Sequence, residues 1–290
     1  MKIAVVALLG LATVLSLIAQ PADPVIDQVK TFMNSNQYEK AVDLLEKAVA
    51  AKPNDATRHF WLARAYVAAA PDAGMFSMMS LGRKVGNEFA TAVKLDPNYI
   101  EARLGLLDFD LMAPGLMGGG VDKAREQAGE IRKRDALAGH RAFAKIAAKN
   151  KDINAERAEY VAAVRENPNS PQAHYWYGTF LLLTEKNYKA SGEEFEAALR
   201  VHVNYMPAYF QIGHLAALSG ANLAQGEGAL QKYLAYKPVD DDPPLYRAHY
   251  WLGRIYEKQG KKADSRAQFQ AALRLRPGDK EVNEALKRAP

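Results

Sequence analysis

One short phrase occurs three times in this chain and constrains its fold more than any other feature. Each copy is a histidine followed by an aromatic residue, a tryptophan, one further residue and a small residue, and the copies begin at His59, His174 and His249. Self-similarity of this kind is the signature of a repeat architecture, in which each copy is one structural unit packed on the next. The sequence therefore predicts an array of similar units.

The last copy shows what each unit contains. Apolar and small residues recur at helical spacing on both sides of a turn at Gly260, and the second segment carries Phe269 and Ala272 before it ends at Pro277. This pattern predicts two helices packed face to face across a glycine turn. The other two copies are also followed by a segment with an aromatic residue and an alanine three places later.

This pattern resembles the tetratricopeptide repeat, which has a tryptophan or similar residue, Leu-Gly and Tyr in its first helix, and Ala, Phe, Ala and a closing Pro in its second, over about 34 residues. The resemblance implies an all-α fold, a right-handed superhelical solenoid of about seven antiparallel helix pairs. The expected repeats are approximately 22–55, 56–99, 100–136, 137–170, 171–205, 206–243 and 244–278, followed by a capping helix at 279–290.

The first residues read as an export signal. Lys2 precedes an apolar run that ends at Ile18, and a small residue and Pro21 follow, so residues 1–19 are expected to be a cleaved signal peptide. The alternative is an uncleaved anchor in the inner membrane, because the run approaches the ~20 apolar residues that cross a bilayer. We expect a bacterial periplasmic protein.

Several kinds of chemistry are excluded or disfavoured. The chain has no cysteine, so it has no disulfide and no thiolate nucleophile. The net charge of +5 is mild and dispersed, and it does not predict nucleic-acid binding. His59, His140, His174 and His249 occupy the same slot of successive repeats, so they lie roughly 10 Å or more apart and cannot converge on a metal. The glycine-rich segment 115–120 is interpreted as an enlarged turn, because no Gly-Lys-Ser/Thr follows it. No catalytic, metal or cofactor site is predicted, and the protein is not expected to be an enzyme.

Two surfaces are predicted to bind protein partners, and the first is a pair of insertions. About ten extra residues, Asp72 to Leu81, are expected between the helices of the second repeat, and a shorter insertion at the equivalent turn of the third. Unbranched methionine side chains repack to suit irregular apolar partners. The alternative is that the insertions fold back onto the solenoid. The candidate docking residues are Met75, Phe76, Met78, Met79, Leu116 and Met117.

The second surface is the concave groove that the resemblance implies, lined by residues one and five places after each repeat's opening slot. Those positions are Phe60, Arg64, Arg141, Lys145, Tyr175, Phe210, His214, Tyr250 and Arg254. An aromatic and basic lining suits an extended or helical segment that bears carboxylates. The alternative is that these residues are solvated or pack on one another. The asparagine and lysine pattern of the family's carboxylate clamp for chaperone tails is missing, so that ligand is not implied.

These inferences predict a non-enzymatic scaffold or adaptor of the bacterial cell envelope with a protein partner and no cofactor. The alternative is a specificity or regulatory subunit of an envelope enzyme or transport system. Contact with a membrane is expected only through an uncleaved N-terminus or the methionine-rich insertions.

Overall fold

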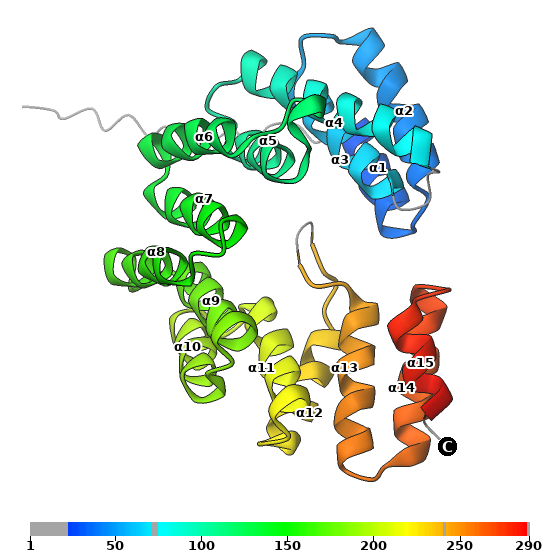
Figure 1. The fold of residues 1–290 in the computed structure, drawn as a ribbon. Coiled ribbons are helices and arrows are strands. Elements are labelled where there is room, and N and C mark those ends of the chain that lie inside the picture. The colour runs from blue at the N-terminus through cyan, green and yellow to red at the C-terminus, as the bar shows by residue number, and fades with distance from the viewer. Residues whose placement is uncertain (1–22, 71–74, 240–241, 289–290) are drawn as a thin grey trace, which may run out of the picture. The chain divides into compact units, whose positions relative to one another are not determined.

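The computed structural model describes residues 23–70, 75–239 and 242–288, and in these ranges the regular structure is entirely helical (Figure 1). The predicted signal peptide lies outside them. The chain divides into two compact parts, residues 1–96 and 97–290, and each is described by itself. No helix of the described residues is long and apolar enough to cross a membrane.

The N-terminal part contains two antiparallel helix pairs. Its helices are α1 (Pro24–Asn34), α2 (Tyr38–Ala51), α3 (Ala56–Ala69) and α4 (Met75–Leu95). Each helix packs on the one that follows it in the sequence.

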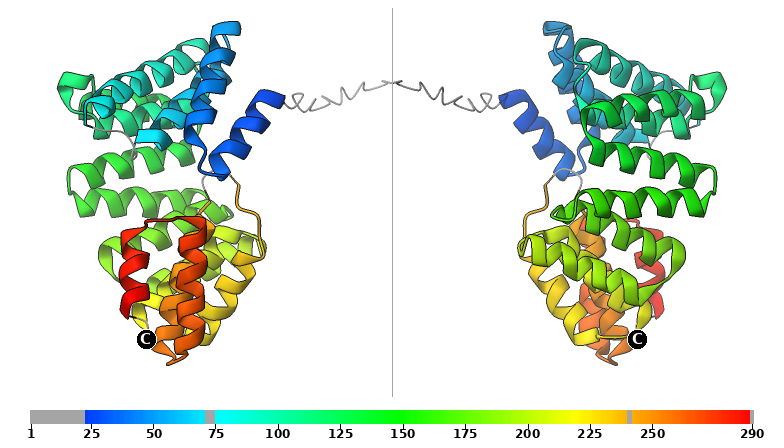
Figure 2. Two further views of the ribbon diagram at one scale, coloured as in Figure 1. Left: turned by 90° about the vertical axis from the view of Figure 1, so that its right-hand side faces the viewer. Right: turned by 90° about the vertical axis from the view of Figure 1, so that its left-hand side faces the viewer.

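The C-terminal part continues the pattern. Its elements are α5 (Ile100–Met112), the 3₁₀ turn η2 (Gly115–Met117), α6 (Val121–Arg134), α7 (Ala136–Lys149), α8 (Ile153–Glu166), α9 (Pro171–Phe180), the π-helical turn η3 (Leu181–Glu185), α10 (Tyr188–Val201), α11 (Met206–Ser219), α12 (Leu223–Leu234), α13 (Leu245–Lys258), α14 (Lys262–Leu275) and α15 (Lys280–Arg288). Helices that are neighbours in the sequence lie side by side in both views of Figure 2 and contact one another. The predicted all-α solenoid of antiparallel helix pairs is confirmed.

Polar side chains fix where several of these helices begin. Asp55, Asp135, Asp152, Ser170 and Asn187 each precede a helix and accept a hydrogen bond from a backbone N–H of its first turn. Such caps satisfy donors that have no partner inside the helix. The caps therefore set the helix starts locally, before any packing between pairs.

The small residue of the repeated phrase lets the two helices of a pair approach closely. The glycines at this slot are Gly178, Gly213 and Gly253. A Cβ atom added at these positions would stand 2.7, 2.2 and 2.5 Å from the nearest side-chain atoms of Phe195, Leu230 and Phe269. Those three side chains have no exposed surface, so the second helix fills the space that the glycine leaves.

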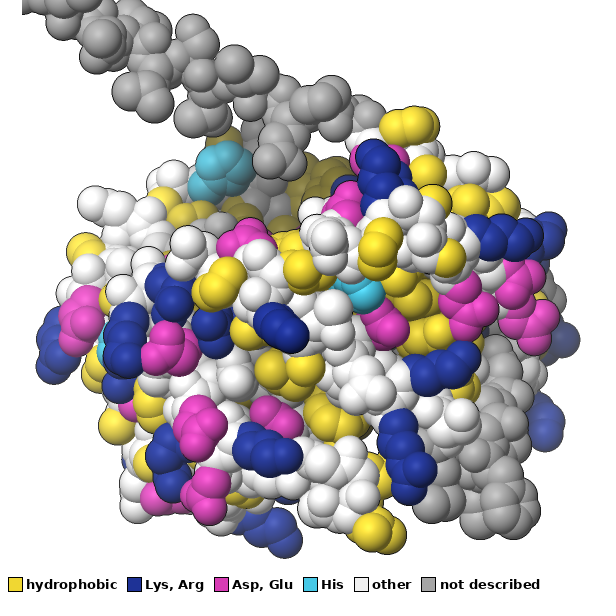
Figure 3. All heavy atoms as spheres, turned by 90° about the horizontal axis from the view of Figure 1, so that it is seen from above, with side chains coloured by type: hydrophobic (Ala, Val, Ile, Leu, Met, Phe, Trp, Pro, Cys, Tyr) yellow, Lys and Arg dark blue, Asp and Glu magenta, His cyan; other side chains and the backbone are white. Residues whose placement is uncertain are grey.

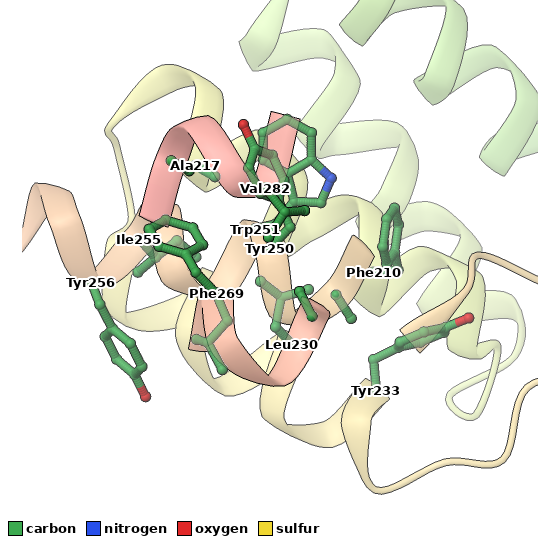
Figure 4. Packing of buried hydrophobic residues seen from close by; sticks show 14 of the residues in the cluster. Phe210, Ala217, Leu230, Tyr233, Tyr250, Trp251, Ile255, Tyr256, Phe269 and Val282 are labelled. Carbon is green, nitrogen blue, oxygen red and sulfur yellow. The ribbon is translucent and has the colours of Figure 1, made fainter. Parts of the chain in front are cut away.

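The largest core cluster lies in the C-terminal helix pairs (Figure 4). Rings and aliphatic chains from α11 to α14 interlock there, with Tyr233 and Tyr250 almost completely buried. Helix α15 closes the cluster, because Val282 and Ala285 have no exposed surface while its remaining residues are mostly polar. The apolar side of the last repeat is therefore covered.

The histidines that open the repeats bridge the two helices of a pair. Their Nδ1 atoms lie within hydrogen-bond distance of side-chain oxygens on the second helix, pairing His59 with Glu88 (2.5 Å), His140 with Glu159 (2.7 Å), His174 with Glu194 (2.6 Å) and His249 with Gln268 (2.7 Å). In two of them Nε2 also faces the carbonyl oxygen of a preceding proline. No group that could hold a metal ion occurs among the described residues. The shared slot thus has a packing and bridging role.

Replacing His174 by alanine is expected to lower the free energy of unfolding by about 2 kcal/mol, because the Glu194 carboxylate and the Pro168 carbonyl each lose a partner. Urea unfolding followed by far-ultraviolet circular dichroism measures the change. His202→Ala is the matched control, since His202 is exposed and its loss should change stability by less than about 0.5 kcal/mol. Equal effects of the two variants would contradict the bridging role.

The second repeat's insertion differs from the expectation. Residues 75–81 were expected in a loop between the helices, but they form the first turns of α4, a helix of 21 residues. Methionine, leucine and phenylalanine are compatible with helix, and the helix continues through Gly82 and Gly86. Residues 71–74, and the side chains of Met75, Phe76, Met78 and Met79, lie outside the described part.

Candidate partner-binding site

Three of the predicted groove residues are buried in the core. Phe60 and Phe210 are 6% exposed and Tyr250 is 1% exposed. Their rings lie 6.1, 5.4 and 5.9 Å from Phe89, Tyr233 and Phe269 on the second helix of the same pair. The expectation that these rings line the groove is therefore corrected. Each of these three rings lies against an aromatic residue of the second helix, so the repeat uses them to fill the space between its two helices.

Other predicted groove residues already have partners within the chain. The Arg64 guanidinium lies over the rings of Phe60 and Trp61, at 5.6 and 4.9 Å. Arg254 donates to the Tyr250 hydroxyl at 3.1 Å and pairs with Glu257 at 2.7 Å. These two arginines are held in place by intramolecular contacts.

Lys145 and His214 are also engaged. Lys145 pairs with both oxygens of Asp108 at 2.6 and 2.7 Å. His214 stacks on Trp251 at 4.1 Å, and burial, together with the charge of Arg247, lowers the pKa of its imidazole to about 4. His214 is therefore neutral near pH 7.

The remaining two residues, Arg141 and Tyr175, line a hollow of about 450 Å³ in the C-terminal part. Helices α7, α8 and α9, the turn η3, the start of α11 and the segment before α13 supply its walls. The lining residues are Arg141, Lys145, Glu156, Tyr160, Gln172, Tyr175, Trp176, Thr179, Phe180, Leu183, Thr184, Tyr205, Pro207, Asp242 and Pro243. A cavity of this size with mixed aromatic and polar walls is suited to a side chain or a short segment of a ligand.

Arg141 is the most distinctive group of this hollow. Its guanidinium lies 5.0 Å from the centre of the Trp176 ring, and it has no hydrogen bond or ion pair among the described residues. Two other basic residues of the predicted groove, Lys145 and Arg254, are paired with acids of the chain. A guanidinium held over an aromatic face, with its N–H donors unused, is prepared to take a carboxylate.

Two tyrosines add further donors to the hollow. Burial, and then the charge of Glu156, raise the pKa of the Tyr160 hydroxyl to about 12, although the charge of Arg141 opposes the rise. Burial also raises the pKa of Tyr205. Both hydroxyls stay protonated at physiological pH and have no hydrogen-bond partner among the described residues. They remain available to donate to a ligand.

The sequence did not single out Tyr160, Trp176 or Tyr205. Trp176 belongs to the repeated phrase, where it reads as a core residue, yet its ring is partly exposed beside Arg141. The π-helical turn that places Leu183 and Thr184 in the wall gave no sequence signal. Such turns carry one extra residue within a helix and are frequent at functional sites.

The other predicted surface, the pair of insertions, is described only in part. At the turn between α5 and α6, Leu116 is 84% exposed and the neighbouring Met112 is 82% exposed, and Met117 is partly buried. Elsewhere, basic and acidic side chains alternate with apolar ones on the face that Figure 3 shows.

The comparisons with known proteins decide the family. Models of the tetratricopeptide repeat match residues 26–72, 141–205 and 246–279, together half of the chain. The chain belongs to the tetratricopeptide repeat family. Repeats of this family characteristically form scaffolds for interactions between proteins.

Solved structures of repeat proteins resemble this tetratricopeptide repeat protein in fold. A repeat protein from Parabacteroides merdae matches with a TM-score of 0.53 at 13% identity, over 91% of this chain and 96% of the other. Yeast Tom70 matches with a TM-score of 0.58 at 14% identity, over 94% of this chain and 65% of the Tom70 chain. A chain of the APC/C heterotetramer Cut9–Hcn1 matches with a TM-score of 0.55 at 13% identity, over 90% of this chain and 48% of the other.

The protein thus spans about half of the Cut9–Hcn1 chain and two thirds of Tom70. Identities this low show the fold alone. No curated protein sequence is detectably similar to this chain.

Proposed function

We propose that this tetratricopeptide repeat protein is a non-enzymatic scaffold or adaptor of the bacterial cell envelope, which holds a carboxylate-bearing segment of a partner protein in the hollow around Arg141. Export rests on the apolar segment at 1–19, which is followed by a helical domain. The exposed turn at Met112 and Leu116 is the second contact surface in this proposal.

Arg141 is the observation that carries the proposal. Its charge is partly buried and has no carboxylate partner among the described residues. A ligand carboxylate would fill that gap with two parallel hydrogen bonds while the Trp176 ring supports the guanidinium. The tyrosine hydroxyls at the same site add donors to the same negative group, so the hollow favours acceptor-rich ligands over apolar ones.

The test is charge reversal at Arg141 in the full chain. A photoreactive amino acid placed at Leu183, which is 52% exposed and lines the hollow, should cross-link in cells to a partner at a segment that contains Asp or Glu. Arg141→Glu should lower the yield at least about 30-fold, the effect of losing one charge-assisted contact and adding a repulsion of about 2 kcal/mol in total.

Arg165→Glu is the matched control, because Arg165 lies on α8, is 71% exposed and does not line the hollow. It makes the same change of charge and should leave the yield unchanged. An unchanged yield in Arg141→Glu, or a cross-linked segment without an acidic residue, would reject the proposal. Release of the protein by osmotic shock, at the mass of a chain cleaved after Ala19, tests the location.

A further inference from the structure

The same hollow contains a second charge without a partner, and its sign is opposite. Glu156 on α8 is only 8% exposed, and its carboxyl has no hydrogen bond or ion pair among the described residues. The other acids at α8 are all engaged. Asp152 caps the helix, Glu159 contacts His140 and Arg132, and Glu166 contacts His140 and Arg165. Glu156 is thus the exception on its own helix.

Leaving this carboxyl unpaired is unfavourable for the isolated chain. Burial, and then the negative charge of Glu185, raise the pKa of Glu156 above its usual value. The position in the first turn of α8 offsets only part of this, because a helix N-terminus stabilises an anion by about 1 kcal/mol or less at most sites. Glu185 itself is paired with Arg157, so neither of these groups neutralises Glu156.

The walls near Glu156 suit a cation. Tyr160 lies one helical turn further along α8, and its ring centre is 5.5 Å from that of Phe180 at an angle of 40°. Aromatic faces beside a carboxylate attract ammonium and guanidinium groups, by cation–π attraction together with charge. Leu183 and Thr184 of the π-helical turn also line the hollow.

Glu156 and Arg141 do not pair with each other, although both line the same 450 Å³. Two opposite charges that stay apart in one small cavity are both unsatisfied unless a ligand brings a partner for each.

We propose that Glu156 is a subsite for a lysine or arginine side chain of the bound segment, so that the hollow selects a segment with one cationic and one acidic residue. The inference rests on the proposed function, in which Arg141 takes the carboxylate. A purely acidic segment leaves Glu156 buried and unpaired and adds repulsion, so the subsite discriminates against it.

Defined peptide pools test this with the full chain immobilised. Each pool contains blocked nonapeptides of Ala and Ser with one Asp and one Lys at all relative positions. In one comparison pool acetyllysine replaces Lys, and in another Asn replaces Asp. Peptides retained by the protein are counted by mass spectrometry. The wild type should retain the Asp and Lys pool about 10-fold more than either comparison pool, as expected for the loss of one charge-assisted contact.

The variants separate the two subsites. Glu156→Gln should reduce the preference for Lys over acetyllysine to less than about 2-fold and keep the preference for Asp over Asn. Arg141→Gln should reduce the preference for Asp over Asn to less than about 2-fold and keep the preference for Lys over acetyllysine. Glu193→Gln, at an exposed position of α10 outside the hollow, is the matched control and should keep both preferences. Far-ultraviolet circular dichroism checks that each variant is folded, and a second variant, Glu156→Met, replaces Glu156→Gln if the latter is not.

The outcomes distinguish this inference from the function on which it rests. A wild-type preference for Asp with indifference to lysine acetylation overturns the Glu156 subsite and leaves the Arg141 site standing. Indifference to both substitutions overturns both. A preference for Lys that survives in the folded Glu156 variant overturns the assignment to Glu156.

Discussion

Replacing Gly213 by alanine is expected to lower the free energy of unfolding by about 2 kcal/mol, although alanine is the better helix former. The added Cβ would stand 2.2 Å from Cγ of Leu230, which has no exposed surface. Overpacking of this kind costs about 1–3 kcal/mol and sometimes more, against a gain of about 1 kcal/mol in helix propensity. Urea unfolding of the full chain, followed by circular dichroism, measures the difference.

Gly228→Ala is the matched control on the facing helix. Gly228 lies within α12, is exposed, and has no atom within 4 Å of an added Cβ. The same substitution there should therefore raise stability, by about 0.5–1 kcal/mol. If Gly213→Ala were neutral or stabilising like the control, close approach of α11 and α12 would not be what this glycine provides.

These glycines also show why so much of the fold was predictable from the sequence. The small residue of the repeated phrase and the large residue of the second helix encode one contact, such as Gly253 against Phe269, within about 16 residues of chain. The helix caps are equally local. Hydrophobic periodicity, helix caps and the match of small to large residues all act within one helix pair. They therefore predicted the helices, their pairing and the repeat family, although the sequence does not show how one pair packs on the next.

The candidate site was predicted much less well, because its properties depend on neighbouring pairs. The slot rule from the resemblance placed Tyr250 and Arg141 in equivalent positions, yet Tyr250 is 1% exposed and Arg141 lines a hollow. The Tyr250 ring lies against the Phe269 ring of the same pair, whereas the Arg141 guanidinium lies over the Trp176 ring of the next pair. Whether a basic residue finds an acid on another helix pair, as Lys145 of α7 finds Asp108 of α5, is likewise decided by how the pairs pack. The π-helical turn η3 has no recognisable sequence pattern, so it could not be predicted.

The sequence pattern also did not predict which acids are buried without a partner. Among these acids, Asp110 is expected to have the largest effect on the pH dependence of stability. It lies near the end of α5, is 5% exposed, and has no side-chain hydrogen bond among the described residues. Burial, aided by the charge of Glu126, raises the pKa of its carboxyl to about 6, although the charge of Lys123 opposes the rise. The folded chain therefore holds the Asp110 proton more tightly than the unfolded chain.

The sign of the pH dependence follows from this shift. A carboxyl whose pKa is higher in the folded state than its usual value of 3.8 contributes stability at low pH, and that stability is lost as pH rises from 3.8 through about 6. The loss amounts to about 2 kcal/mol between about pH 4 and pH 7.5. Asp110→Asn removes the titrating group, so the free energy of unfolding of the variant minus that of the wild type should increase by about 2 kcal/mol between about pH 4 and pH 7.5. The buried amide changes the stability of the variant equally at every pH, so it does not affect this increase.

Urea unfolding of both proteins at several pH values measures this increase. His214 titrates in the opposite sense, since its lowered pKa of about 4 makes stability fall as pH falls, but it is present in both proteins and cancels in the difference. Asp122→Asn, whose side chain is 96% exposed in the wild type, should show little change at any pH. Parallel curves for the wild type and Asp110→Asn would mean that Asp110 has a partner in solution, and the α5–α6 turn would then be the place to look for it.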